Sequence, residues 1–295
     1  MLPSESQAKT KKKGFYLSVD LEDFTYDTYR NLKLEPKINF QALDKCYEVI
    51  NNFLEDNIGS RKITFFTTGT VALTYPDLLK KISMDGHEIS CHYHFHDLMS
   101  NQSINEIESN IILAREAIKS ACGYYPAGFR APAFSISRDR DDIYVLLSKY
   151  FKYDSSYVIH EREMIDGLHA NKPPFNINNF KEFPIVTNSF VRKFNIKSGG
   201  TFFRVLSVNK IKETLNKSIQ RKADPLIYLH PYDFLHEFEF KVPLKIFLSN
   251  SSFLSGIYKY LKQFQWLGLG NRQTLKKLKH ILSEYDHIGP MKDIS

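Results

Sequence analysis

The feature that most constrains this chain is an alternation of short apolar strands with amphipathic helices, which continues through most of its 295 residues. Segments typical of buried strands lie at 15–20, 62–67, 87–91, 128–130, 152–154, 182–186 and 226–229. Helical patterns lie at 40–57, 73–82, behind the Ser103–Glu106 capping box, at 139–149 and at 211–219. The alternation predicts a parallel sheet covered by helices, and its length favours a barrel.

Polar residues follow five of these predicted strands. They are Asp20, Glu22 and Asp23 after the first, His92 and His96 after the third, Arg130 after the fourth, Asp154 after the next and His230 after the last. In a parallel α/β barrel the carboxyl ends of the strands converge on one face, where active sites form. The sequence therefore predicts an enzyme.

The pair His92 and His96 is a candidate for metal binding. Two histidines four residues apart can face one ion if a strand end turns into a helix. The chain has ten histidines, so such pairs arise by chance, and His87 and His94 are better explained as structural. Two imidazoles and a carboxylate leave coordination positions open for water and substrate, as in catalytic sites. Cys91, the neighbour of His92, is expected in the strand core.

The charge, the cysteine content and the N-terminal sequence indicate which partners and which cellular compartment to expect for this protein. The net charge of +7 favours anionic partners. Zinc-finger spacing and basic heptads are missing, so we expect no nucleic acid. Three cysteines do not form a disulfide framework. The N-terminus lacks the apolar core of a signal peptide and no apolar run is long enough to span a membrane, which favours the cytoplasm.

Composition also suggests how the chain is divided. Residues 1–13 are polar and basic, and we expect a disordered tail there. Residues 14–240 contain the strand–helix alternation and are predicted to form the barrel domain. Residues 241–295 are basic and mostly helical in pattern, and are predicted to pack on the barrel. A polar stretch at 160–180, with Pro173 and Pro174, is expected to be a long loop.

Several motifs occur in a fixed order along the chain. They are LSVDLEDF (17–24), TFFTTG (64–69), GHEISCHYHFH (86–96), GFRAPAFSIS (128–137), YDSS (153–156), EFPI (182–185), GGTFFRVL (199–206) and YLHPYDF (228–234). The chain thereby resembles the polysaccharide deacetylases of carbohydrate esterase family 4 over about residues 15–285. With WLGLGNRQTLKKL (266–278), it is similar to a bacterial subgroup from exopolysaccharide, capsule and lipopolysaccharide loci.

The resemblance implies a distorted parallel (β/α)7 barrel, here with a helical C-terminal extension, and a metal-dependent hydrolase. His92 and His96 would bind a divalent metal, with Zn²⁺ expected, which would activate a water molecule. The third ligand would be a carboxylate of the first motif. Many members have two adjacent aspartates there, whereas this chain has Leu21 in the second place. Alternation along a strand favours Glu22, and Asp23 remains open.

The remaining roles also come from the resemblance. Asp20 would be the general base, oriented by Arg130, and His230 would be the general acid. Asp154 would be the charged partner of His230, and Leu229 would line the acetyl pocket. A backbone N–H near Ala133 would contact the oxyanion.

The expected substrate is an N-acetylated sugar of a cell-surface glycan or its cytoplasmic precursor. A nucleotide sugar or a lipid-linked saccharide would fit that compartment, and the basic aromatic segment 241–280 suggests peripheral contact with an anionic inner membrane. Two alternatives stay open. One is a related amide hydrolase acting on a small cyclic imide or ureide. The other is a catalytically inactive glycan-binding protein.

Overall fold

The computed structural model of the chain describes residues 12–38, 40–137, 139–160, 179–189, 195–235 and 240–293. The predicted disordered tail and the predicted loop at 160–180 lie almost entirely outside these residues. Of the predicted tail, the structure describes only Lys12 and Lys13, and Lys13 is the first residue of the first strand.

A parallel sheet forms the centre of the molecule. Its strand order is β11 (Leu226–Leu229), β1 (Lys13–Leu21), β2 (Thr64–Thr67), β3 (Glu88–Cys91), β4 (Gly128–Phe129), β5 (Tyr153–Asp154) and β7 (Lys181–Glu182). Every neighbouring pair in this order is parallel. Since β11 and β7 stand at the two ends, the curled sheet is an incomplete barrel within the described residues. This confirms the predicted distorted parallel barrel.

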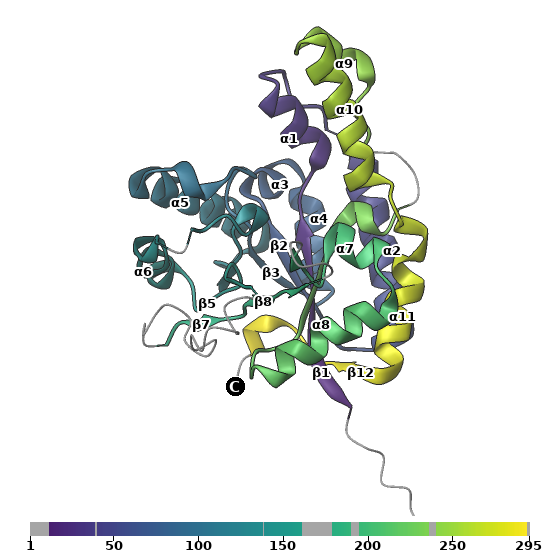
Figure 1. Cartoon of the computed structure of the whole chain (residues 1–295). Helices are drawn as coiled ribbons and strands as arrows, with labels where there is room; N and C mark the ends of the chain where they lie inside the picture. Colours follow the sequence, from purple (N-terminus) through teal and green to yellow (C-terminus); the bar gives the residue numbers. More distant parts are fainter. Residues whose placement is uncertain are drawn as a thin grey trace, which may run out of the picture.

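Helices surround the sheet (Figure 1). They are α1 (Phe24–Asn31), α2 (Phe40–Ile58), α3 (Gly69–Thr74), α4 (Pro76–Met84), α5 (Ile104–Cys122), α6 (Asp141–Tyr150), α7 (Gly200–Val205) and α8 (Val208–Gln220). The predicted capping box begins α5, where the Ser103 and Glu106 side chains each bond the other residue's backbone N–H. The apolar faces of α2 to α8 pack on the sheet in one large core, whereas Tyr29 of α1 packs with Val242 and Phe247 in a separate cluster.

Two proline residues account for differences from the predicted elements. The helix expected over 73–82 is divided, because Pro76 begins α4 as a separate helix after α3. The strand expected over 182–186 is also divided. Pro184 separates β7 from β8 (Ile185–Val186), which pairs with β6 (Val158–Ile159) in a second small sheet. A further small sheet pairs β9 (Asn188–Ser189) with β10 (Asn195–Ile196).

The C-terminal segment returns to the central sheet. It contains α9 (Leu244–Ser249), α10 (Phe253–Leu267), α11 (Thr274–Glu284) and β12 (Tyr285–His287). Strand β12 pairs in parallel with the first half of β1, where Lys13 lies opposite Tyr285. Besides the mostly helical pattern that was expected, the segment therefore also adds a strand to the sheet. None of the described helices has the length and apolarity required to cross a membrane.

Candidate active site

The carboxyl ends of β1, β3 and β11 meet at a cavity of about 340 Å³. Asp20, Glu22, His92, His96 and His230 all line it. Side-chain alternation explains the contribution of β1, because Asp20 and Glu22 point to the same face. The structure thus brings together five of the residues singled out in the sequence.

Glu22, His92 and His96 form a compact group of potential metal ligands. Their ligand atoms all lie within 4.8 Å of one another, and Oε2 of Glu22 lies 2.6 Å from Nε2 of His96. Nδ1 of His92 donates a hydrogen bond to the backbone oxygen of Arg130 at 2.8 Å. This fixes the ring so that Nε2 is available as a ligand. Tyr232 donates its hydroxyl hydrogen to Oε1 of Glu22 at 2.5 Å, which holds the carboxylate in place.

The electrostatics of this group also suit a cation. Burial alone would raise the pKa of Glu22, but His96, with His230 and His92, lowers it below its ordinary range. Burial opposes the protonation of His96, whereas the Glu22 carboxylate raises the pKa of His96 to about 9. Burial lowers the pKa of His92 to about 4, so this imidazole is neutral. A buried carboxylate beside two imidazoles fits a divalent cation, which would take the place of the proton on His96.

Asp23 lies outside this group, and its candidacy as a metal ligand is corrected. Its Oδ1 accepts a hydrogen bond from the backbone N–H of Tyr26 at 3.0 Å, so Asp23 is the N-cap of α1. Its Oδ2 accepts the hydroxyl of Tyr75. The chain leaves the strand after Glu22 and begins a helix, which turns the next carboxylate to capping.

Arg130 holds Asp20 at the other side of the cavity. Nη1 of the fully buried arginine lies 2.5 Å from Oδ1 of Asp20 and 2.9 Å from Oγ of Ser18. Its Nη2 donates to Oγ of Ser155 at 2.9 Å. The guanidinium also lies over the Phe66 ring, 4.1 Å from its centroid. These contacts give Arg130 one geometry, in which it can orient the Asp20 carboxylate.

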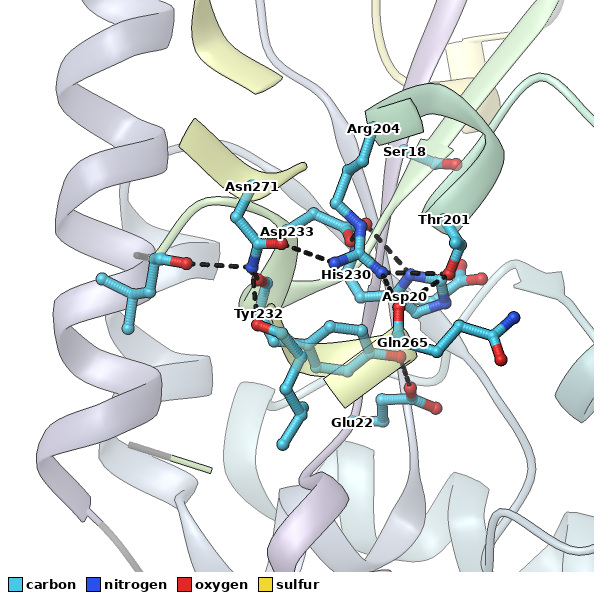
Figure 2. Close-up of polar contacts among 12 residues, drawn as sticks. Ser18, Asp20, Glu22, Thr201, Arg204, His230, Tyr232, Asp233, Gln265 and Asn271 are labelled. Carbon is cyan, nitrogen blue, oxygen red and sulfur yellow. Dashed lines mark hydrogen bonds and ion pairs between the residues drawn. The ribbon is translucent and has the colours of Figure 1, made fainter. Parts of the chain in front are cut away.

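His230 has a different partner from the one that the resemblance implied. Its Nδ1 lies 3.1 Å from Oδ2 of Asp233, which also accepts the backbone N–H of His230 at 2.7 Å. Oδ1 of Asp233 lies 2.7 Å from Nε of Arg204. Figure 2 shows this chain of contacts beside Asp20 and Glu22. Burial alone would lower the pKa of His230, but Asp233, with smaller effects of Glu22 and Asp20, raises it above its ordinary value.

The expected roles of Asp154 and Leu229 are corrected. Asp154 accepts hydrogen bonds from the backbone N–H and hydroxyl of Ser156, and its neighbour is Glu182 rather than His230. Leu229 is fully buried in the core. Because neighbouring side chains on a strand alternate, Tyr228 and His230 face the cavity and Leu229 faces away. Ala133 does line the cavity, with a left-handed φ of 52°.

The two glycines of the GGTFFRVL motif allow a close approach beside His230. A Cβ on Gly199 would lie 2.1 Å from the backbone oxygen of Tyr228, which leaves no room for a side chain. Gly200 has a left-handed φ of 52°, which favours glycine. The backbone can therefore turn directly against β11 and bring Arg204 behind the site.

Four residues that sequence reasoning missed complete the site: Tyr232, Asp233, Arg204 and Asn271. All four belong to the quoted motifs, but the motifs alone do not specify which of their side chains meet. Oδ1 of Asn271 accepts from Nη1 of Arg204 at 2.5 Å, and its amide nitrogen is directed at the backbone oxygen of Tyr232. Asn271 thus fixes both the arginine and the turn that carries the acid. The three-residue spacing of His230 and Asp233 was the available signal, because the two share one turn of 3-10 helix.

Comparisons with known proteins cover the chain in two parts. The family described as Polysaccharide deacetylase matches residues 43–148, and a family described as Domain of unknown function (DUF3473) matches residues 155–288. The first match contains both histidines and Arg130. The second contains His230, Asp233, Arg204 and Asn271. The candidate site therefore takes residues from both matched parts.

Curated relatives match over shorter stretches. A peptidoglycan-N-acetylglucosamine deacetylase from Bacillus cereus is 31% identical over 108 residues, which is 37% of this chain and 34% of the relative. A chitooligosaccharide deacetylase from Bradyrhizobium is 34% identical over 70 residues, 23% of this chain and 32% of the relative. The matched stretches thus span about a third of these relatives.

Solved structures give weaker likenesses over longer stretches. The peptidoglycan deacetylase PdaC from Bacillus subtilis has a TM-score of 0.43 at 13% identity, covering 95% of this chain and 89% of that one. A family 4 carbohydrate esterase from Streptomyces lividans in complex with acetate has a TM-score of 0.41 at 15% identity, covering 88% and 93%.

The fold and the site define an α/β barrel protein with a candidate metal centre at the carboxyl ends of its strands. Residues 43–148, with the motifs within them, match the polysaccharide deacetylase family.

Proposed function

We propose that the protein is a metal-dependent hydrolase that removes an N-acetyl group from a sugar of a cell-surface glycan or of its precursor. One observation carries the proposal. A His–His–carboxylate group, an arginine-held aspartate and an aspartate-paired histidine all line one cavity. Amide hydrolysis requires these three functions together, namely an activated water, a base and an acid.

A divalent metal held by Glu22, His92 and His96 would polarise the amide carbonyl and lower the pKa of a water molecule. Zn²⁺ suits this mixed nitrogen and oxygen donor set. The residues of the chain perform the remaining chemistry. Asp20, oriented by Arg130, accepts the proton of the attacking water.

His230 acts on the opposite side of the reaction. It donates a proton from Nε2 to the leaving amine, while Asp233 holds Nδ1 and favours the cationic ring. The backbone N–H of Ala133, at the cavity wall, is the proposed donor to the developing oxyanion.

The relatives and the cavity wall support the proposed substrate class. The relatives are a peptidoglycan-N-acetylglucosamine deacetylase and a chitooligosaccharide deacetylase. Trp266 lines the cavity and is 42% exposed, so its ring offers a face on which a sugar ring can pack. We therefore propose an N-acetylated hexosamine as the reacting unit. A nucleotide-linked or lipid-linked form, a role in exopolysaccharide or lipopolysaccharide synthesis and a cytoplasmic location remain predictions.

The test measures acetate release by the purified full chain. Candidate substrates are N-acetylchitooligosaccharides, peptidoglycan fragments and UDP-N-acetylglucosamine, each assayed before and after chelation and after addition of Zn²⁺, Co²⁺ or Ni²⁺. The expected result is release from at least one substrate that chelation abolishes and metal restores. Tight metal binding without acetate release from any sugar would favour the glycan-binding alternative. Hydrolysis of cyclic imides or ureides without sugar deacetylation would favour the second enzyme class.

A further inference from the structure

The outward face of α10 is apolar. Leu254, Tyr258 and Leu261 are 79%, 62% and 60% exposed, and their spacing of four and three residues places them on one side of the helix. The opposite side of the helix is buried through Gly256, Gln263 and Leu267. In an ordinary surface helix the side facing away from the core is polar, so α10 has the reverse pattern on its solvent side.

The chain around this apolar face carries positive charge only. Residues 241–280 contain eight Lys and Arg residues and neither Asp nor Glu, while the whole chain has a net charge of +7. Lys241, Lys245, Lys259 and Lys262 lie on or beside α9 and α10, whereas Arg272, Lys276, Lys277 and Lys279 lie at or in α11, where Nζ of Lys277 donates to backbone oxygens of α7. Lys262 lies beside the apolar face, with Nζ 5.7 Å from the Tyr258 ring centroid and 5.6 Å from that of Trp266.

The same helix leads to the candidate active site. Trp266, near the end of α10, lines the 340 Å³ cavity that holds the metal-ligand group. It also lines a second cavity of about 180 Å³ between α1 and α10, with Phe24, Leu32 and Phe247. Figure 1 shows α9 and the start of α10 extending beyond the barrel, with α1 beside them. Helix α10 thus carries both the exposed apolar face and one residue of the cavity wall.

We propose that α9 and α10 dock on an anionic lipid surface, with Leu254, Tyr258 and Leu261 inserted among the acyl chains and the exposed Lys245, Lys259 and Lys262 at the headgroups. Apolar and aromatic residues bordered by lysines are typical of helices that lie in a membrane interface. An acidic protein partner could pair with the lysines, but its acidic charge alone would not account for the three exposed apolar side chains. On the proposed function, docking holds the cavity against the surface from which a lipid-linked sugar would enter.

The single tryptophan of the chain reports docking directly. Fluorescence of Trp266 and co-sedimentation are measured for the full chain with phosphatidylcholine vesicles and with vesicles containing phosphatidylglycerol. We expect binding, a blue shift and quenching by brominated acyl chains with anionic vesicles only, and at least tenfold weaker binding in 0.5 M salt than in 0.05 M salt. Equal binding to neutral vesicles, or no binding to anionic ones, overturns the proposal.

A matched pair of variants tests the surface itself. The triple variant Leu254→Ser, Tyr258→Ser, Leu261→Ser should weaken vesicle binding at least tenfold. The control Leu73→Ser, Met84→Ser changes two side chains that are 62% and 77% exposed on other helices, and should bind as the parent does. Equal losses in both variants, or loss in neither, contradict the proposal. So does concentration-dependent self-association that only the triple variant abolishes.

Docking and catalysis are measured separately, so either proposal can fail alone. The triple variant should keep the parent rate of acetate release from a water-soluble oligosaccharide, since none of its three positions lines the cavity. Asp20→Asn should bind anionic vesicles as the parent does. Absence of deacetylation in the parent with intact vesicle binding rejects the proposed function and leaves the docking surface standing.

Discussion

Arg204 and Asp233 form an ion pair behind the catalytic histidine candidate, with Nε of the arginine 2.7 Å from Oδ1 of the aspartate and both side chains fully buried. The other oxygen of the same carboxylate faces His230. The arginine therefore fixes an aspartate that in turn fixes the acid. Asn271 and the Gln265 backbone oxygen hold the guanidinium from the C-terminal segment, so that segment is part of the site (Figure 2).

Asp233→Asn should impair proton donation by His230. The aspartate raises the pKa of His230, so its removal lowers that pKa and the cationic form is lost at lower pH. The high-pH limb of kcat/KM should move to lower pH, and kcat at neutral pH should fall by about 10- to 100-fold. Asp154→Asn is the matched control, since its carboxylate contacts Ser156 and not the histidine. A shifted limb in the control alone would restore Asp154 as the partner.

Glu22→Gln and Asp23→Asn should separate metal binding from helix capping. The first removes a charged ligand candidate, and metal affinity should fall by about 100-fold or more, measured by competition with a chromogenic chelator. The second should keep metal affinity within about twofold, because Asp23 lies outside the ligand group and Asn can still cap α1. Removing the cap altogether in Asp23→Ala should lower the free energy of unfolding by about 1 kcal/mol. A larger loss of metal affinity in Asp23→Asn would reverse the assignment of the two carboxylates.

His92→Ala and Asp20→Asn should separate metal binding from proton transfer. Loss of an imidazole ligand should remove both the metal and acetate release. Asp20→Asn should retain the metal and lose most turnover, roughly 10²–10⁴-fold, because the base is removed while the ligand group stays. Metal content by atomic emission and single-turnover rates are the two measurements. Full activity in Asp20→Asn would remove this residue as base.

The free energy of unfolding should depend on pH through His87. Its Nδ1 accepts the backbone N–H of Ile63, and burial, with nearby Lys62, lowers its pKa from 6.5 to about 4. Above pH 6.5 the ring is neutral in both states. Between pH 6.5 and 4 only the unfolded chain takes up the proton, so stability should fall by up to about 3 kcal/mol. In His87→Gln, the free energy of unfolding measured with urea should fall less over this pH range than in the parent. An unchanged fall would mean that other groups cause the pH dependence.

The spacing of apolar residues predicted the fold well, because every helix and every strand must bury one face in the core. The positions of Asp20, His92, His96, Arg130 and His230 also followed, since the ends of parallel strands converge. Side-chain pairing was less predictable. Whether His230 meets Asp154 or Asp233 depends on how tightly the chain turns after β11, and strand order alone does not contain that information.

Asn271 and β12 were missed for a related reason. Both act through contacts with residues far away in the sequence, Arg204 in one case and β1 in the other. Local periodicity indicates that the C-terminal segment is helical, but it does not indicate which distant backbone a three-residue strand will join. The position of Leu229, by contrast, is predictable. Side chains alternate along β11, so Leu229 faces the core once Tyr228 and His230 face the cavity.

The pairing of β1 has a consequence for the order in which the molecule assembles. This strand carries Asp20 and Glu22, yet its partners include β11, where Val19 lies opposite Leu229, and β12, where Phe15 lies opposite His287. Closing contacts between segments so far apart in sequence is slow, because chain entropy is lost before the contacts form. We therefore expect the contacts of β1 with β11 and β12 to form late in folding, and a chain interrupted before β11 would carry both histidines but neither His230 nor Asp233.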